Sequence, residues 1–334
     1  MRTQTTRGRA AAPGAPGLMP QPPGSTGLPR TNAPLALVGP TASGKTEASI
    51  ELARRLGAEI LVVDSMTVYR GMDVGTAKPT PQHRAAVPHH LLDVADPSEP
   101  FSVARFQALA RHALGRVTAR GRTALLVGGS GLYFRAAVDD LAFPGTDPAV
   151  RRRLEAEAAA LGAEPLHARL SAVDPEAAAR IGPPNVRRTV RALEVIGLTG
   201  RPFSSFASRW ERFDPGAVRA AGVRVEPSAL ARRIEERVRR MWADGLLEEV
   251  RALLDRGLGG FLTASKAIGY LEAGEHLAGH LTRREAEEAT VRRTRALARR
   301  QVAWFRRDPR IRWFDADERG GAALVDRVEE HLRG

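Results

Sequence analysis

The stretch that decides the fold is a short apolar run followed by a glycine-rich turn. It reads Leu35-Ala36-Leu37-Val38-Gly39-Pro40-Thr41-Ala42-Ser43-Gly44-Lys45-Thr46. Residues 35–38 predict a buried strand, and residues 45–56 predict a helix. The turn between them, residues 39–46, matches the pattern G-x-x-x-x-G-K-[ST]. A strand that enters a helix through such a turn is typical of a phosphate-binding loop.

The residue types in this loop suit phosphate chemistry. The glycines let backbone N–H groups curl around phosphate oxygens, and the start of the helix adds positive potential. Lys45 supplies a compact charge, and the Thr46 hydroxyl can bind Mg²⁺. The chain has 51 basic residues but only three lysines, at positions 45, 78 and 266, so a lysine here is informative. We therefore expect residues 39–46 to bind a diphosphate or the phosphates of a nucleotide such as ATP.

Two more polar residues follow predicted strands. Asp64 comes directly after the four apolar residues 60–63 of the predicted strand 59–63, and Ser130 lies in a glycine turn after the predicted strand 123–127. Ligands of open parallel sheets bind at the carboxyl ends of the strands, so both side chains are candidates for the same site. Asp64 could bind Mg²⁺ or act as a general base, and Ser130 could donate a hydrogen bond. The alternative for each is a turn residue without a chemical role.

The order of the elements predicts an α/β fold, a P-loop NTPase-like parallel sheet with flanking helices and an inserted all-helical domain. Strands at 35–38, 59–63 and 123–127 alternate with helices at 45–56 and 103–120, which indicates parallel strands with right-handed crossovers. Residues 147–212 hold no convincing strand. Instead, Asp147-Pro148, Asp174-Pro175 and Asn185 predict the starts of short helices. Long helices are expected at 228–254 and 282–306, and a short strand at 311–315.

These features divide the chain into five segments. Residues 1–33 are rich in proline and glycine and are expected to be a disordered tail. The first part of the core spans 34–146, a helical insertion spans 147–215, and the second part of the core, with an arginine-rich helix, spans 216–316. A C-terminal helix or tail follows at 317–334.

Composition narrows the function classes. The 334 residues carry a formal net charge of +13, which favours a polyanionic partner. The absence of cysteine excludes disulfide frameworks and cysteine-ligated metal sites. No apolar run approaches the length of a membrane span, so we expect no membrane partner and a cytoplasmic protein. Nothing in the sequence requires more than a monomer.

Arginines gather on one face of the predicted helix 290–306. They are Arg292, Arg295, Arg299 and Arg306, whereas Leu297, Trp304 and Phe305 fall on the opposite side. Such a helix suits docking on a phosphate backbone, and the alternative is a solvated surface. Further arginines cluster at 151–153 and 187–191.

Taken together, a series of motifs resembles those of the tRNA dimethylallyltransferases, also called isopentenyltransferases or IPP transferases. They are the loop at 39–46, Asp-Ser-Met-Thr-Val-Tyr-Arg-Gly-Met-Asp-Val-Gly-Thr-Ala-Lys-Pro at 64–79, Pro-His-His-Leu-Leu-Asp at 88–93, Gly-Gly-Ser-Gly-Leu-Tyr at 128–133, Arg-Ala-Leu-Glu-Val at 191–195, Ala-Ile-Gly-Tyr at 267–270 and Arg-Arg-Gln-Val-Ala-Trp-Phe-Arg at 299–306. The resemblance runs from about residue 35 to 315. The run at 64–79 is far more specific than the phosphate loop, which many families share.

The resemblance implies transfer of a dimethylallyl group from dimethylallyl diphosphate to N6 of the adenine on the 3′ side of the anticodon. It implies that the phosphate loop holds the prenyl diphosphate with Mg²⁺ and that Asp64 is the general base. Ser130 matches a position that contacts tRNA near the reacting centre, and Arg237 matches an arginine that holds the diphosphate. Contacts to the anticodon stem-loop are implied at Asp64, Ser65, Met66, Thr67, Ser130, Arg151, Arg187, Arg188, Thr189, Val190 and Arg191.

Two other readings stay open at this point. A small-molecule kinase with Asp64 as base would explain the phosphate loop, but it gives the arginine faces and the insertion no role. An RNA-binding relative of the nucleotide hydrolases without catalytic activity would not need Asp64. An affinity for RNA that falls steeply as the salt concentration rises would distinguish the tRNA-modifying enzyme from the kinase.

Overall fold

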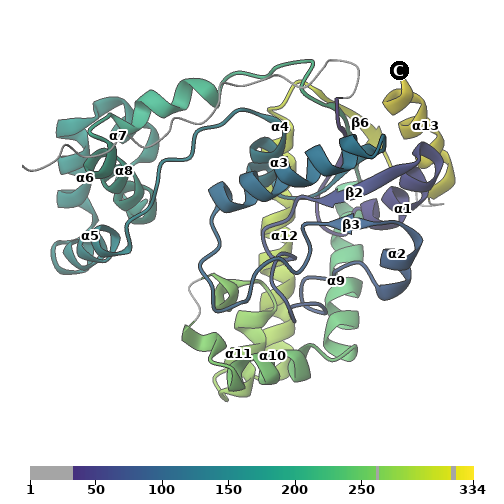
Figure 1. Cartoon of the computed structure of the whole chain (residues 1–334). Coiled ribbons are helices and arrows are strands. Elements are labelled where there is room, and N and C mark those ends of the chain that lie inside the picture. Colours follow the sequence, from purple (N-terminus) through teal and green to yellow (C-terminus); the bar gives the residue numbers. More distant parts are fainter. Residues whose placement is uncertain (1–32, 261–262, 317–320) are drawn as a thin grey trace, which may run out of the picture.

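The computed structural model describes residues 33–260, 263–316 and 321–334, so residues 1–32 of the tail predicted at 1–33 lie outside the described residues. A parallel sheet of six strands forms its centre, in the order β3-β2-β4-β1-β5-β6 (Figure 1). The strands are β1 (Leu35–Val38), β2 (Ala58–Val62), β3 (His89–His90), β4 (Thr123–Gly128), β5 (Arg219–Arg224) and β6 (Ile311–Asp315). The predicted parallel α/β sheet is confirmed.

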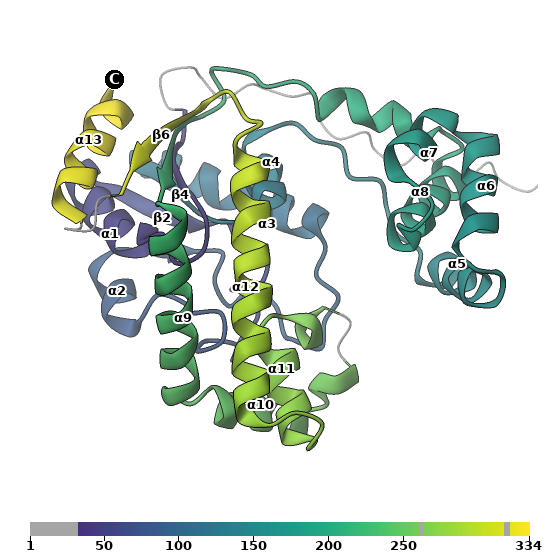
Figure 2. The ribbon, with the colours of Figure 1, turned by 180° about the vertical axis from the view of Figure 1, so that it is seen from behind.

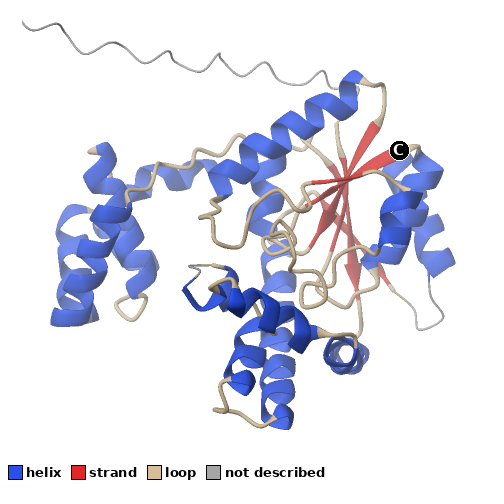
Figure 3. Ribbon diagram, turned by 60° about the horizontal axis from the view of Figure 1, so that its bottom comes forward, coloured by secondary structure: helices blue, strands red, loops and turns tan. Residues whose placement is uncertain are grey.

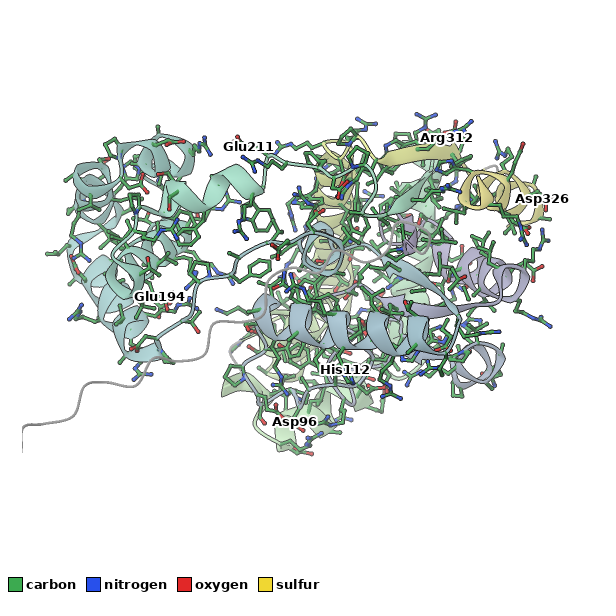
Figure 4. The ribbon with its side chains drawn as sticks, turned by 45° about the horizontal axis from the view of Figure 1, so that its top comes forward. Asp96, His112, Glu194, Glu211, Arg312 and Asp326 are labelled. Carbon is green, nitrogen blue, oxygen red and sulfur yellow. The ribbon has the colours of Figure 1, made fainter. Side chains whose placement is uncertain are left out.

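Helices cover both faces of the sheet (Figure 3). One face packs against α1 (Lys45–Leu56) and α13 (Gly321–Arg333), and Arg55 of α1 bonds to Asp326 of α13 at 2.6 Å. Figure 4 labels Asp326 at this end of the molecule. The other face packs against α3 (Val103–Ala119) and α4 (Gly131–Val138). The C-terminal helix is therefore part of the core packing.

The remaining core helices extend from the sheet as a bundle. They are α9 (Pro227–Ala243), α10 (Leu246–Asp255), α11 (Tyr270–Leu277) and α12 (Arg283–Phe305), with α2 (Pro81–Ala86) beside the sheet and short 3₁₀ turns at Leu258–Gly260 and Ala264–Lys266. Figure 2 shows α9 and α12 running side by side. The expected single helix at 228–254 was wrong. Gly245, with φ of 104°, ends α9 and redirects the chain into α10.

Strand β5 had no counterpart among the predicted strands. Its sequence is Arg-Ala-Ala-Gly-Val-Arg, which lacks the β-branched run that marks a strand. It is nevertheless central, between β1 and β6. A Cβ on Gly222 would lie 2.7 Å from the Ile311 side chain and 2.8 Å from the Trp313 ring of the neighbouring strand β6. Glycine is therefore needed at this position of β5.

The segment after α4 is helical and lies to one side of the core (Figures 1 and 2). It contains α5 (Pro148–Leu161), α6 (Ala163–Val173), α7 (Pro175–Ile181), α8 (Val186–Thr199) and a 3₁₀ segment at Phe203–Arg209, around a small core of its own. The predicted caps are confirmed, because Asp147, Asp174 and Asn185 each accept a backbone N–H at a helix start.

Buried Arg135 ties the returning linker of this segment to the core. Its guanidinium donates to the carbonyls of Trp210 at 3.1 Å and Arg212 at 2.8 Å. Residues 139–147 lead from α4 into the helical segment, and residues 210–218 lead back to β5. The two linkers meet where Phe143 packs edge-on against Trp210, with ring centroids 5.9 Å apart. Among the described helices, none is long and apolar enough to cross a membrane.

Candidate active site

The phosphate loop joins β1 to α1, as its sequence predicts. Gly44 has φ of 84°, and Ala42 takes the left-handed conformation at 62°, which costs a residue with a Cβ on the order of 1–3 kcal/mol. Gly39 is closely packed, since a Cβ there would lie 3.0 Å from the carbonyl oxygen of Val223 and the backbone would have to shift slightly. The Ser43 hydroxyl is buried and makes no hydrogen bond to the described residues. Tertiary packing thus holds a strained loop in which one buried hydroxyl, that of Ser43, is left without a partner among the described residues.

Positive charge is concentrated beside this loop. The Lys45 ammonium donates to the carbonyl of Pro40 at 3.0 Å. Burial and, after it, the charge of Arg237 lower the pKa of Lys45 to about 8, while the charge of Asp64 opposes the shift. Burial also lowers the pKa of Arg237, which donates from Nη2 to the carbonyl of Thr76 at 3.3 Å. Two neighbouring, partly buried cations of lowered pKa favour binding of an anion.

A cavity of 1530 Å³ opens over the loop. Residues 42–46 form one wall, and Arg233, Arg237 and Arg240 of α9 line another. These arginines are four and three residues apart, so they share one face of the helix. Neither Arg233 nor Arg240 forms an ion pair with the described residues. Sequence reasoning named only Arg237, although this spacing could have pointed to all three.

Asp64 and Ser130 lie at the same edge of the sheet as the loop. Asp64 follows β2, and its Oδ1 accepts the backbone N–H of Met66 at 2.8 Å. The Ser130 N–H donates to the carbonyl of Val63 at 3.3 Å, which fixes the glycine turn beside Asp64. Gly39 N–H in turn donates to the carbonyl of Gly128 at 3.3 Å. The structure therefore brings Asp64, Ser130 and the phosphate loop together, as the strand order predicts.

One residue at this edge was missed by sequence reasoning. Gln301 of α12 accepts the Thr41 backbone N–H on its Oε1 at 2.9 Å. Its Nε2 lies against Gly129, where a Cβ would approach it to 2.4 Å. The only sequence signal was the run 299–306, which contains Gln301 but assigns it no chemistry.

The residues predicted to contact tRNA after Asp64 have different exposures. Ser65 and Met66 are half-buried, whereas Thr67 is buried and its hydroxyl makes no hydrogen bond within the described chain. Met66 packs against the main core. Only part of this stretch is therefore accessible to a large ligand in the present arrangement.

The residues of the insertion that were predicted to contact tRNA fall into two groups: some are engaged within the protein, and others are exposed. Arg151 and Arg191 both bond to Oε2 of buried Glu194, at 2.6 and 2.8 Å, and Arg191 also binds the carbonyl of Pro144 (Figure 4 labels Glu194). Arg151 thus joins α5 to α8 within the insertion, and Arg191 ties α8 to the segment that precedes it. Thr189 and Val190 are buried in the insertion, whereas Arg187 and Arg188 are exposed and form no ion pair with the described residues.

The arginine face of α12 borders a second groove, of 920 Å³, between α9 and α12. Arg299 and Arg306 line it without an ion partner among the described residues, while Arg295 pairs with Glu235 of α9. Arg292 is exposed, with Glu288 at 4.0 Å. On the opposite side Trp304 packs against Gly131 and Phe305 is fully buried, so the predicted two-sided character of the helix is confirmed.

Comparison with known proteins shows the family to which the chain is related. A family model described as IPP transferase matches residues 67–308, and one described as isopentenyl transferase matches residues 34–93. A tRNA dimethylallyltransferase of Salinispora arenicola is 55% identical over 87% of this chain and 84% of its own length. The corresponding protein of Kineococcus radiotolerans is 55% identical over 86% of this chain and 92% of its own.

Solved structures give the same result. The tRNA isopentenylpyrophosphate transferase of Bacillus halodurans has a TM-score of 0.66 and 41% identity, covering 91% of this chain and 96% of its own. A eukaryotic dimethylallyltransferase acting on tRNA has a TM-score of 0.75 and 25% identity, covering 88% of this chain and 77% of its own. The loop, the site residues and these matches along most of the chain lead to one conclusion: the chain belongs to the IPP transferase family.

Proposed function

We propose that this protein transfers a dimethylallyl group from dimethylallyl diphosphate to N6 of the adenine 3′ of the anticodon in tRNA, releasing diphosphate. One observation carries the proposal: the phosphate loop, Asp64 and Ser130 meet at one edge of the sheet. Membership of the IPP transferase family and the names of its closely similar relatives support the same reaction.

The donor half of the reaction is assigned to the cationic cavity. Lys45 and Arg237 neutralise the diphosphate, and the backbone N–H groups of residues 44–46, at the start of α1, surround its oxygens. Charge builds on the diphosphate as the allylic C–O bond breaks, so these groups stabilise the transition state more than the bound donor. The diphosphate leaves with the electron pair of that bond.

The acceptor half is assigned to Asp64 and Ser130. The N6 nitrogen attacks the allylic carbon, and the Asp64 carboxylate takes the proton that N6 loses. An aromatic amine is a weak nucleophile, so a positioned base contributes about 10²–10⁴-fold. The Ser130 hydroxyl does not cap α4 and is left for the substrate. The adenine must leave its stack to reach this edge.

Mg²⁺ is the proposed metal. The half-buried Thr46 hydroxyl makes no hydrogen bond to the described residues, and buried Ser43 has a free hydroxyl beside it. Oxygen donors of this kind, completed by substrate phosphates and water, fit Mg²⁺. No cluster of three or more His, Asp or Glu side chains that could hold a metal occurs in the described part of the chain. Bound Mg²⁺ would neutralise charge on the departing diphosphate.

The proposed tRNA-binding surface consists of arginines on the insertion and on α12 of the core. Arg187 and Arg188 of the insertion and Arg299 and Arg306 of α12 are exposed cations without ion partners in the described chain. They suit contacts to the phosphate backbone of the anticodon stem-loop. Arg151 and Arg191 support this surface through Glu194. One copy of the chain carries the arginines of the insertion and those of α12, so the proposed binding of tRNA needs only a monomer.

The test of this function uses purified protein, Mg²⁺, dimethylallyl diphosphate and unmodified tRNA with adenine 3′ of the anticodon. Nucleoside mass spectrometry is expected to show one added dimethylallyl group on that adenine. A tRNA with guanine at the same position is the control and is expected to gain nothing. If several tRNAs with the adenine all stay unmodified, the proposal is wrong, and transfer of phosphate from added ATP to a hydroxyl acceptor, with formation of ADP, would favour a kinase.

The pH profile gives a second prediction. Because Lys45 has a pKa of about 8, the free enzyme loses its ammonium as pH rises through that value. We expect kcat/KM for the donor to fall above about pH 8, approaching tenfold per pH unit, since kcat/KM reports ionisations of the free enzyme. In Lys45→Arg the fall should disappear, whatever the absolute rate, because guanidinium stays charged. A flat profile from pH 7 to 10 in the unaltered enzyme contradicts this assignment.

A further inference from the structure

The most distinctive motif in the sequence, residues 64–79, contains a second half whose role the reaction above leaves unexplained. Residues 73–75 present three consecutive backbone N–H groups to one carboxylate. Glu249 of α10 accepts the N–H of Asp73 at 2.8 Å and of Val74 at 2.9 Å on Oε2, and of Gly75 at 3.1 Å on Oε1. Successive N–H groups that converge in this way form an anion-binding concavity. Here the anion is a side chain of the protein itself.

The carboxylate has a fourth donor. The Tyr270 hydroxyl, from α11, donates to Glu249 Oε1 at 2.5 Å. Burial, together with the charge of Glu249, raises the pKa of Tyr270, so the phenol stays protonated and remains a donor. The Tyr270 ring also lies so close to Gly75 that a Cβ there would approach it to 2.3 Å. Glu249 is therefore fixed in place by α11.

The same loop is held from its other end by Lys78, whose side chain is almost completely buried. Its ammonium donates to the carbonyl of Tyr69 at 2.5 Å, to Asp73 at 2.6 Å and to Asp93 at 2.6 Å. All three donors of the ammonium are used. The loop is thus clamped at both ends, by a carboxylate on one side and a cation on the other.

Between these clamps the loop reaches the donor cavity. We call residues 73–75, whose N–H groups bind Glu249, the cradle. The carbonyl of the next residue, Thr76, accepts a hydrogen bond from the Arg237 guanidinium at 3.3 Å. Asp73, Val74 and Ala77 line the same cavity as Lys45 and Arg237. Because Gly75 is bonded to Glu249 and Thr76 to Arg237, a shift of the cradle moves the carbonyl that orients the guanidinium.

We propose that Glu249 is a positioning residue for the donor half of the reaction: it holds residues 73–75 so that the Thr76 carbonyl keeps Arg237 directed at the diphosphate. This inference rests on the proposed function. It explains why Asp73, Gly75 and Lys78 occur together in one motif although none of them is assigned to the chemistry.

The test compares Glu249→Gln with Glu248→Gln, a neighbour on α10 that is exposed and makes no ion pair in the described chain. The amide has one acceptor oxygen, and its NH₂ group opposes the backbone donors. We expect KM for dimethylallyl diphosphate to rise about tenfold, the cost of roughly one misplaced charged hydrogen bond. KM for tRNA should stay within about twofold, and Glu248→Gln should match the unaltered enzyme.

A double-mutant cycle with Arg237→Ala separates positioning from a general structural effect. If Glu249 acts through Arg237, adding Glu249→Gln to Arg237→Ala gives no further rise in KM for the donor. Additive effects overturn the proposal, and so does a KM for the donor equal to that of the unaltered enzyme. If Glu249→Gln does not fold, Tyr270→Phe, which removes only the fourth donor, is put through the same cycle with the same two outcomes.

The two proposals fail in different ways. If the unaltered enzyme modifies no tRNA, the proposed function is wrong. If it modifies tRNA normally and Glu249→Gln does so with an unchanged KM for the donor, only the role of Glu249 is wrong.

Discussion

Asp64→Asn is expected to lower kcat about 10²–10⁴-fold, the range for loss of a positioned general base. The substitution isolates the chemistry, because an asparagine oxygen can still accept the Met66 N–H that Asp64 accepts at 2.8 Å. The turn after β2 therefore keeps its shape. KM for dimethylallyl diphosphate should change by less than about threefold. Single-turnover transfer, measured by nucleoside mass spectrometry at saturating tRNA, gives the rate of the chemical step.

The matched control for this variant is Asp96→Asn. Asp96 also accepts a backbone N–H two residues later, from Ser98 at 3.0 Å, but its carboxylate pairs with Arg256 at 2.9 Å, whereas that of Asp64 acts on Lys45. It should keep the rate of the unaltered enzyme. An Asp64→Asn enzyme that still transfers the group at a similar rate would show that Asp64 is not the base.

Lys45→Ala is expected to lower kcat/KM for the donor about 10²–10³-fold. The reason differs from that for Asp64: the ammonium binds the diphosphate and also stabilises the charge that develops on it, so both KM and kcat should worsen. Steady-state kinetics with varied dimethylallyl diphosphate separate the two parameters. Lys45→Arg should recover only part of the loss, because a planar guanidinium does not fit a cradle built for a compact ammonium.

Arg54→Ala is the control on the same helix. Arg54 is exposed on α1 and does not line the donor cavity, so its removal should leave the kinetics unchanged. If Lys45→Ala and Arg54→Ala both keep normal kinetics, the assignment of the loop to the donor diphosphate is wrong.

Local features of the chain were predictable because local physics decides them. The strand–turn–helix at 35–56 follows from an apolar run, glycines and a helix start, and the structure places α1 at the expected residues. The helix starts after Asp147, Asp174 and Asn185 follow from side-chain capping of nearby N–H groups. Asp64 and Ser130 were found because parallel strands direct their carboxyl ends to one edge.

Features that depend on distant partners were not predictable in the same way. Arg151 and Arg191 lie in basic clusters, yet both bind Glu194, and Arg151 is 43 residues away from it. The sequence of 187–191 does not show that Thr189 and Val190 point inward while Arg187 and Arg188 point outward. An arginine pattern shows charge, whereas its use depends on which acids the fold brings near.

By itself the sequence determined the parallel α/β core, the phosphate loop, the two polar residues at the neighbouring strand ends and the helical character of the insertion. The tertiary structure alone decided that 219–224 is a central strand, that Gly245 splits a helix, and that Gln301 and Glu249 reach loops 260 and about 175 residues away. The physical reason is the range of the interactions. Capping, glycine turns and apolar periodicity act over a few residues, whereas a carboxylate that binds three N–H groups of a distant loop leaves no periodic trace in either segment.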